Sequence, residues 1–232
     1  MLARFLSAIP AAALIAIAAA GASASAQAPQ TAQAPIAAAA QKPKIPKPWP
    51  PDAEALKKRR LDAEAIPLFQ GEEPIEIVLT ADWKAVQRDR NDDSKTLYPG
   101  SLAIVTGGAP GTPIPIELRT RGHSRRNPRT CAFAPLRLEL PKDKTKGTIF
   151  AGHGNIKLGV HCQGDGIFQQ YTLLEYLAGR LHNVLTPRSL RARLARVTYA
   201  ETDGGKAPYT KLGVFFEDVD DMAKRVEARE LS

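Results

Sequence analysis

The chain has 232 residues, of which 44% are hydrophobic and 24% are charged, and its formal net charge at pH 7 is +8. This length holds one domain with a sizeable core once the low-complexity N-terminal part is set aside, but not two such domains. The basic charge suits an anionic polymer or a membrane surface. Few aromatic residues lie among the arginines, which argues against a nucleic-acid-binding protein.

The N-terminus predicts an export signal. Arg4 precedes an apolar run over 5–20, and small residues follow over 21–28, as in a secretory signal peptide with its cleavage site. The apolar run is shorter than the ~20 strongly apolar residues that span a bilayer. We therefore expect an exported protein, periplasmic or extracellular, with no transmembrane segment after cleavage of residues 1–28.

The next segment, residues 29 to about 50, is rich in Ala, Gln, Pro and Lys. Such a composition cannot bury a core and predicts an extended spacer. Residues 52–65 are polar and poorly amphipathic, so they predict either a helix or a continuation of the spacer. We accordingly divide the chain into a signal peptide (1–28), a linker with a polar segment (29–70) and a folded domain (71–232).

The folded domain shows strand patterns interrupted by helices. Alternating apolar residues and turn signals predict strands at 75–80, 98–106, 112–121, 136–140, 155–162, 190–198 and 210–217. Asp82 starts a predicted short helix that ends near Arg88, and a terminal helix is predicted over 219–229. A central helix is predicted over 168–183 from the helical spacing of Phe168, Tyr171, Leu174, Ala178 and Leu181. This order indicates an α+β fold: a strand-rich lobe with one central helix, a C-terminal hairpin and a terminal helix.

An arginine cluster surrounds one glycine between two predicted strands. Its members, with a nearby serine, are Arg119, Arg121, Gly122, Ser124, Arg125, Arg126 and Arg129. Like charges repel one another unless an anion neutralises them, and the arginine fork matches phosphate or carboxylate oxygens. The cluster predicts either an anion-binding site or a solvated basic loop, and the residues alone leave both open.

Cys131 and Cys162 are the two cysteines of the chain. In an exported protein such a pair predicts a disulfide. The alternative is a zinc or thiol-chemistry site that uses His123, His153 or His161, but the spacing matches no common zinc pattern. We predict no metal site, and we expect His153 to be an exposed turn residue between two glycines.

The order of several short motifs resembles the CotH family of spore-coat-type atypical protein kinases. The resemblance covers about residues 72–226 and includes an Arg-x-Arg-Gly-x-Ser-Arg stretch, a Pro-Leu-Arg-Leu strand and a Gly-Val-Phe-Phe-Glu-Asp strand end. It places the first family motif on Arg119, Arg121, Gly122, Ser124 and Arg125. It places the last motif on Gly213, Phe215 and Glu217. The resemblance implies a kinase-type fold that uses ATP with Mg²⁺.

The same resemblance implies that the acidic residues for metal binding and phosphoryl transfer lie in a later half, so we expect a truncated member that is inactive alone. Lys157 on a predicted strand and Glu175 on the next helix have the order of a kinase lysine–glutamate pair, or else they are surface charges. Asp218, Asp220 and Asp221 suit helix capping. The chain is thus expected to be the nucleotide-facing half of a kinase, without phosphoryl-transfer activity of its own. The alternative is a binding module for anionic phosphate or glycan ligands, whose partner is a nucleotide or an anionic polymer.

Overall fold

The structure is a computed structural model and describes residue 49 and residues 52–229. The predicted signal peptide and nearly all of the predicted spacer lie outside these residues. The strands are β1 (Ile75–Ala81), β2 (Tyr98–Thr106), β3 (Ala109–Pro110), β4 (Ile114–Thr120), β5 (Leu136–Glu139), β6 (Asn155–Gly159), β7 (Ala192–Glu201) and β8 (Tyr209–Phe216). The helices are α1 (Ala53–Glu64), α2 (Trp83–Arg88), α3 (Gly166–Leu185) and α4 (Val219–Arg225), with single 3₁₀ turns at Pro67–Phe69 and Ser124–Arg126.

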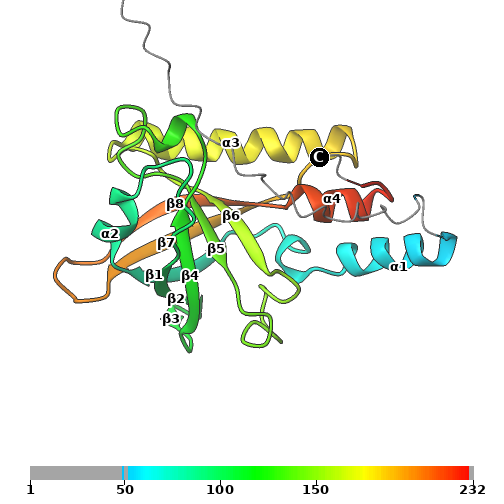
Figure 1. The fold of residues 1–232 in the computed structure, drawn as a ribbon, viewed down its shortest axis with the longest axis horizontal. Coiled ribbons are helices and arrows are strands. Elements are labelled where there is room, and N and C mark those ends of the chain that lie inside the picture. Colours follow the sequence, from blue (N-terminus) through cyan, green and yellow to red (C-terminus); the bar gives the residue numbers. More distant parts are fainter. Residues whose placement is uncertain (1–48, 50–51, 230–232) are drawn as a thin grey trace, which may run out of the picture. The chain divides into compact units, whose positions relative to one another are not determined.

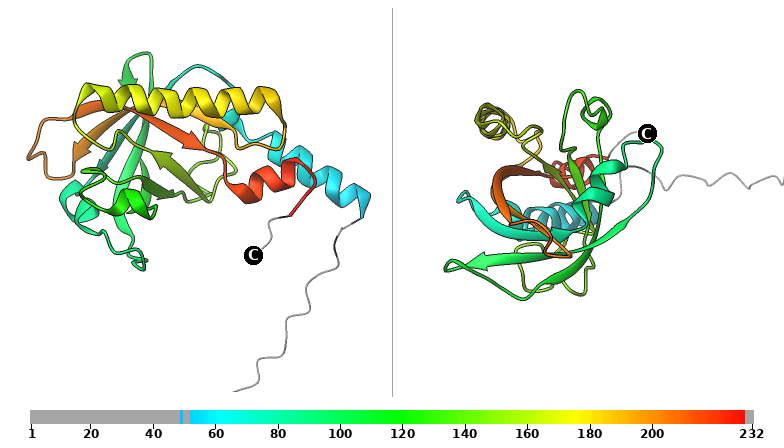
Figure 2. Two further views of the ribbon diagram at one scale, coloured as in Figure 1. Left: turned by 90° about the horizontal axis from the view of Figure 1, so that it is seen from above. Right: turned by 90° about the vertical axis from the view of Figure 1, so that its left-hand side faces the viewer.

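Seven strands form a closed sheet. Their order is β1-β7-β8-β6-β5-β4-β2, and β2 pairs again with β1 to complete the ring. Strands β1 and β7 run parallel, all other neighbours run antiparallel, and the short β3 extends β2. Helix α3 lies along the outside of the sheet, and α1 and α4 lie side by side near one end of it (Figure 1 and Figure 2). The mixed α+β class predicted from the sequence is confirmed.

The core fills the inside of this ring because the strands alternate apolar and polar residues. In β4, Ile114, Ile116 and Leu118 are buried, whereas Pro115 and Glu117 are exposed. The same period of two buries the leucines of β5 and β6 and directs their charged residues outward. The outer face of β4, β5 and β6 is therefore the polar side of the sheet.

The structure differs from the predicted boundary at residue 71. Residues 53–64 form α1, which begins at Asp52, whose carboxylate accepts a hydrogen bond from the backbone N–H of Ala55. The following turn buries Leu68 in the main core, so α1 and this turn belong to the folded unit. Of the two alternatives for this segment, the helix is the one that forms; its polar composition left the choice open because α1 contributes few apolar side chains and packs mainly against α4.

Cys131 and Cys162 form a disulfide, as predicted. Because the two sulfurs are bonded to each other in the structure, neither is a thiolate that could bind zinc. The histidines proposed for the alternative zinc site serve other purposes: His123 contacts Asp92 on the surface, and His161 is buried in an aromatic cluster. In that cluster the His161 ring stacks on Phe133 with centroids 4.8 Å apart and meets Tyr199 edge-on.

Burial of His161 predicts a loss of stability in acid. Desolvation, with a smaller contribution from Lys211, lowers the pKa of His161 to about 4, whereas an unfolded histidine titrates near ~6.5. Between these values the unfolded chain binds a proton that the folded chain does not, so the free energy of unfolding falls as pH drops from about 6.5 to about 4, by about 3 kcal/mol. We expect His161→Phe to flatten this part of the pH profile of chemical denaturation. The matched change at exposed His123 should leave it unaltered, and equal profiles for His161→Phe and wild type would contradict the assignment.

Candidate functional site

A row of cations crosses the outer face of three neighbouring strands. The register pairs Arg119 of β4 with Arg137 of β5, and Arg137 with Lys157 of β6. Residues paired in this way lie on the same face, and like charges placed opposite one another destabilise a sheet. The row therefore needs negative charge, from the protein or from a ligand.

The protein supplies part of that charge. Glu139 lies 2.9 Å from the Arg137 guanidinium and 3.9 Å from that of Arg119. Asp218, just beyond β8, lies 3.2 Å from the Lys157 ammonium. Burial alone would raise the pKa of Asp218, but Lys157, the backbone N–H of Asp220 and Arg137 together lower it, so this carboxylate is ionised at neutral pH.

The arginine loop after β4 divides its side chains between two tasks. Gly122 has φ of +91°, a left-handed conformation that favours glycine, and it turns the chain away from the sheet. Arg126 is buried and donates to the backbone carbonyls of Asn91 and Thr120, so it holds the loop in place. Arg125 instead reaches α3, where it makes a bidentate contact with Glu175 at 3.0 and 3.3 Å. Ser124 is exposed at the start of the 3₁₀ turn.

Arg121 is partly buried and, unlike Arg119, Arg125 and Arg126, has no carboxylate partner in the described part of the chain. Among the described residues, no carboxylate lies within ion-pair distance of its guanidinium. Burial first, and then the neighbouring charges of Arg125 and Arg137, lower its pKa, while Glu175 and Asp218 oppose that shift. A half-buried guanidinium beside two other cations is unfavourable on its own, and an anion would relieve it.

A polar cleft of about 450 Å³ opens beside this row. Strand residues Arg137, Asn155 and Lys157 form one wall. The opposite wall consists of the start of α4 with Asp218, Asp220, Asp221 and Lys224, and the loop before β6 adds Lys142. Lys224 pairs with Asp220 and Asp221 at 2.7 and 2.9 Å. The predicted capping role of the three aspartates is confirmed for Asp218, which accepts from the N–H of Asp220.

His153 does not sit in an exposed turn, contrary to the prediction. It is 2% exposed, packs edge-on against Phe69, and lies with Nδ1 4.0 Å from a carboxylate oxygen of Asp221. Burial lowers its pKa more than Asp221 raises it. Its two flanking glycines indicated a turn, but Phe69 and Asp221 of α4 lie against the side chain.

Lys157 and Glu175 lie on the same face of the sheet without forming the predicted type of pair. Glu175 approaches β6 at Gly159, where an added Cβ would lie 3.6 Å from its carboxylate. Its ion partner is Arg125, while the partner of Lys157 is Asp218.

The last motif of the resemblance, Gly213, Phe215 and Glu217, consists of residues that hold the fold together. Gly213 leaves room for Leu158 and the backbone of Gly159, and Phe215 is part of the core. Glu217 is fully buried and accepts hydrogen bonds from the guanidinium groups of Arg191 and Arg225. These contacts join the start of β7 to α4.

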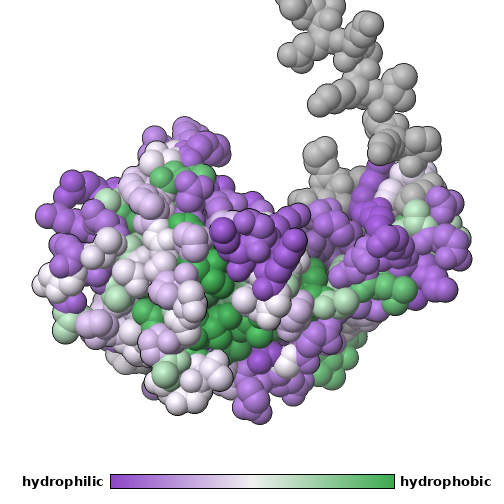
Figure 3. Space-filling model, turned by 90° about the horizontal axis from the view of Figure 1, so that it is seen from below, coloured by the Kyte–Doolittle hydropathy of each residue, from purple (hydrophilic) through white to green (hydrophobic). Residues whose placement is uncertain are grey.

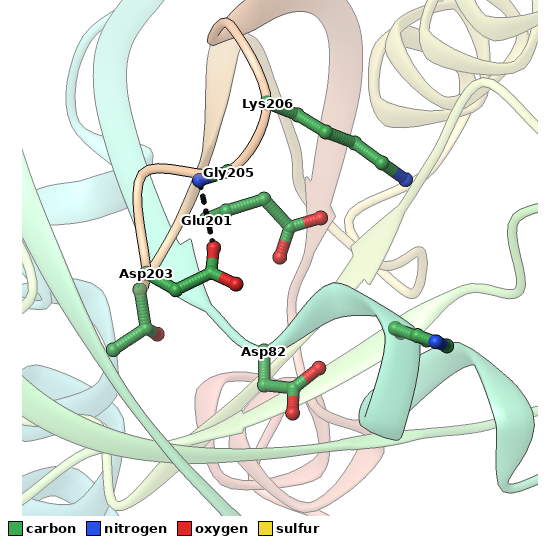
Figure 4. Close-up of a pocket in the computed structure, with 7 residues that line it drawn as sticks. Asp82, Glu201, Asp203, Gly205 and Lys206 are labelled. Carbon is green, nitrogen blue, oxygen red and sulfur yellow. Dashed lines mark hydrogen bonds between the residues drawn. The ribbon is translucent and has the colours of Figure 1, made fainter.

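A second hollow, of about 300 Å³, lies at the turn between β7 and β8. Figure 4 shows Asp82, Glu201 and Asp203 beside it together with Lys206. Each carboxylate already accepts a backbone N–H, from Ala85, Trp83 and Gly205 respectively. Within the described part of the chain, no group of three or more potential ligands could hold a metal ion. We therefore treat this hollow as structural.

The face turned away from α3 has a central apolar area bordered by polar residues (Figure 3). Grooves of about 510 and 560 Å³ lie along β2 and β4 and are lined mainly by prolines, isoleucines and glycines. They bring together no set of polar groups comparable to the basic row. Of the helices in residues 52–229, none is long and apolar enough to cross a bilayer.

Comparison of the chain with protein-family models, with curated proteins and with solved structures found no significant match. The function must therefore be inferred from the site itself. The sequence identified Arg121, Arg125, Lys157 and Glu175 as candidates, and all four lie in or beside the row of cations. It missed Arg137, Lys142 and Lys224. The alternating pattern of its strand could have shown that Arg137 points outward. It could not have shown which cations lie beside it.

Proposed function

We propose that this domain binds a phosphate-bearing anion at the basic face formed by Arg121, Arg137 and Lys157, beside the polar cleft. The observation that carries the proposal is the uncompensated guanidinium of Arg121 next to Arg125 and Arg137. Such a site costs free energy without a ligand and gains hydrogen bonds and charge pairing with one.

The chemistry favours phosphate over an isolated carboxylate. Arg137 and Lys157 of this basic face lie opposite one another on adjacent strands, which lie about 4.8 Å apart. A polyphosphate chain or a phosphorylated sugar presents several oxygens over this distance, whereas a single carboxylate reaches one cation. Export, which the disulfide favours, would place the site where anionic surface polymers are met.

The central test measures binding of inorganic tripolyphosphate by titration calorimetry at low ionic strength. We expect Arg121→Ala to weaken binding by about 1.5–3 kcal/mol, the worth of a hydrogen bond to a charged group, or roughly ten- to hundredfold in Kd. Arg196→Ala is the matched control, because Arg196 on β7 is exposed and meets only Glu76 at 3.9 Å. Equal losses in both variants would mean that binding reflects net charge alone. Unchanged binding in Arg121→Ala would refute the site.

A second candidate function is the nucleotide-facing half of a CotH-like kinase, which the sequence resemblance implies. One arrangement favours it: Lys157 on β6 and Glu175 on α3 share the face that would receive a nucleotide. The cations fit the phosphate groups of ATP. For Mg²⁺, no group of three or more carboxylates, histidines or cysteines in the described residues is arranged so that it could hold the ion.

Comparing ATP with tripolyphosphate separates the two candidates. If ATP binds at least tenfold more tightly, with or without Mg²⁺, the base is recognised and the nucleotide candidate is supported. Equal affinities, with a sulfated glycan competing for the same site, would support the anion-binding module instead. In either case Lys157→Gln should weaken binding, because Lys157 belongs to both versions of the site.

A further inference from the structure

Helix α3 carries most of its apolar side chains on the face turned away from the sheet. Toward the sheet it presents Thr172, Tyr176 and Gly179, and Gly179 allows a close approach to Ala192 of β7. Away from the sheet lies a set of exposed residues that we call the outer stripe: Ile167, Tyr171, Leu174, Ala178, Leu181 and Leu185. The five larger members are between 44 and 73% exposed. Figure 2 shows α3 on the outer side of the sheet.

The spacing of the outer stripe is that of a coiled-coil seam. Its members follow one another at alternating intervals of four and three positions along the helix. This is the heptad pattern through which one helix packs against another. The helix amphipathicity predicted from the sequence is thus present, but its apolar side is not used by the sheet.

The stripe is complementary to a reversed copy of itself. Its order of intervals is the same in both directions, so an antiparallel pair brings Ile167 opposite Leu185 and Tyr171 opposite Leu181. The central layer then places Leu174 opposite Ala178, a large residue opposite a small one, which is the arrangement that fills space well. A two-fold symmetric contact of this kind closes after two copies.

Charge also favours a second copy over a membrane surface. Both charged side chains of α3 are already engaged within the chain, Glu175 with Arg125 and Arg180 with Glu72. Self-association therefore leaves no charge unpaired. A helix that lies on a membrane surface carries lysines and arginines on its polar face, and α3 has no lysine and only this one arginine.

We propose that two copies of this protein associate through antiparallel pairing of the outer stripes of α3. One helix pair of about 28 Å is a small interface, so the dimer is weak and depends on concentration. This association does not depend on the basic face, because the stripe points away from the sheet.

Sedimentation equilibrium of the purified protein from about 1 to 200 μM tests the proposal. We expect a monomer–dimer equilibrium, and a dissociation constant at least tenfold higher for Leu174→Glu and for Leu181→Glu. Both side chains are more than half exposed, at 58 and 63%, so these changes should leave the thermal melt unaltered. Leu97→Glu is the matched control, an equally drastic change at a leucine that is exposed elsewhere.

Cysteine crosslinking tests the orientation. Mixing Tyr171→Cys with Leu181→Cys should give an oxidised heterodimer, whereas neither variant alone should crosslink efficiently. A wild-type protein that stays monomeric over the whole range would overturn the proposal. So would a dimer that Leu174→Glu leaves intact, or crosslinking of each variant with itself. Lipid-vesicle binding by a monomer, lost in Leu174→Glu, would assign the stripe to a membrane instead.

Discussion

Replacing Glu217 by glutamine is expected to lower the free energy of unfolding by about 3–5 kcal/mol. Glu217 is completely buried, and its carboxylate lies 2.8 Å from the Arg191 guanidinium and 2.9 Å from that of Arg225. Glutamine keeps the size of the side chain but removes its charge. Two guanidinium groups then remain with no buried counter-charge, which is the costly way to break an ion network.

The effect should spread beyond one contact because the two arginines join separate elements. Arg191 also donates to the carbonyl of Ala63 at the end of α1, and Arg225 donates to the carbonyls of Pro187 and Ser189. Urea denaturation followed by circular dichroism measures the loss. Glu76→Gln is the control, since the pair of Glu76 with Arg196 is exposed and long at 3.9 Å, and such pairs contribute about 0–1 kcal/mol. Equal stability of the two variants would show that the buried network is dispensable.

The sequence predicted the elements well wherever local patterns decide them. The strand at Leu136–Glu139 follows from its own alternation, and α2 follows from the capping carboxylate of Asp82. Closure of the sheet was not predictable in this way. The parallel pairing of β1 with β7 joins Ile75 to Ala195, residues far apart in the chain, and no local pattern specifies that choice.

The candidate site likewise has some features that local sequence predicts and others that depend on contacts between distant segments. Charge density around Gly122 indicated a basic cluster, and the structure places Arg121 and Arg125 there. The sequence could not show that Arg126 turns inward, because burial of an arginine depends on carbonyls supplied by other loops. Nor could it show that Lys157 pairs with Asp218, which depends on how β8 lies beside β6.

Removing the disulfide is the second change with a large expected effect. Cys131 and Cys162 are 31 positions apart, and closing a loop of that size stabilises a fold by about 3–4 kcal/mol in the chain-entropy model. We expect Cys131→Ala combined with Cys162→Ala to lose this amount in urea denaturation. The control is wild-type protein treated with a reductant, which breaks the bond but keeps both cysteine side chains. It should show a similar loss in the free energy of unfolding. Mass spectrometry of unreduced peptides must first show the two cysteines linked in exported protein; two free thiols would remove the premise.

The same change should weaken anion binding, because of where the bond lies. Cys131 ends the arginine loop that begins at Arg121, and Cys162 follows the strand that carries Lys157. The bond therefore ties the loop to the strand whose cations it must face. Without it, ordering the loop around a ligand costs conformational entropy at each binding event, and we expect a several-fold higher Kd for tripolyphosphate at a temperature where the variant remains folded. The loop has a second anchor in Arg126, which donates to the carbonyls of Asn91 and Thr120. An unchanged Kd in the folded variant would mean that this anchor alone positions Arg121, and that the disulfide stabilises the fold without shaping the site.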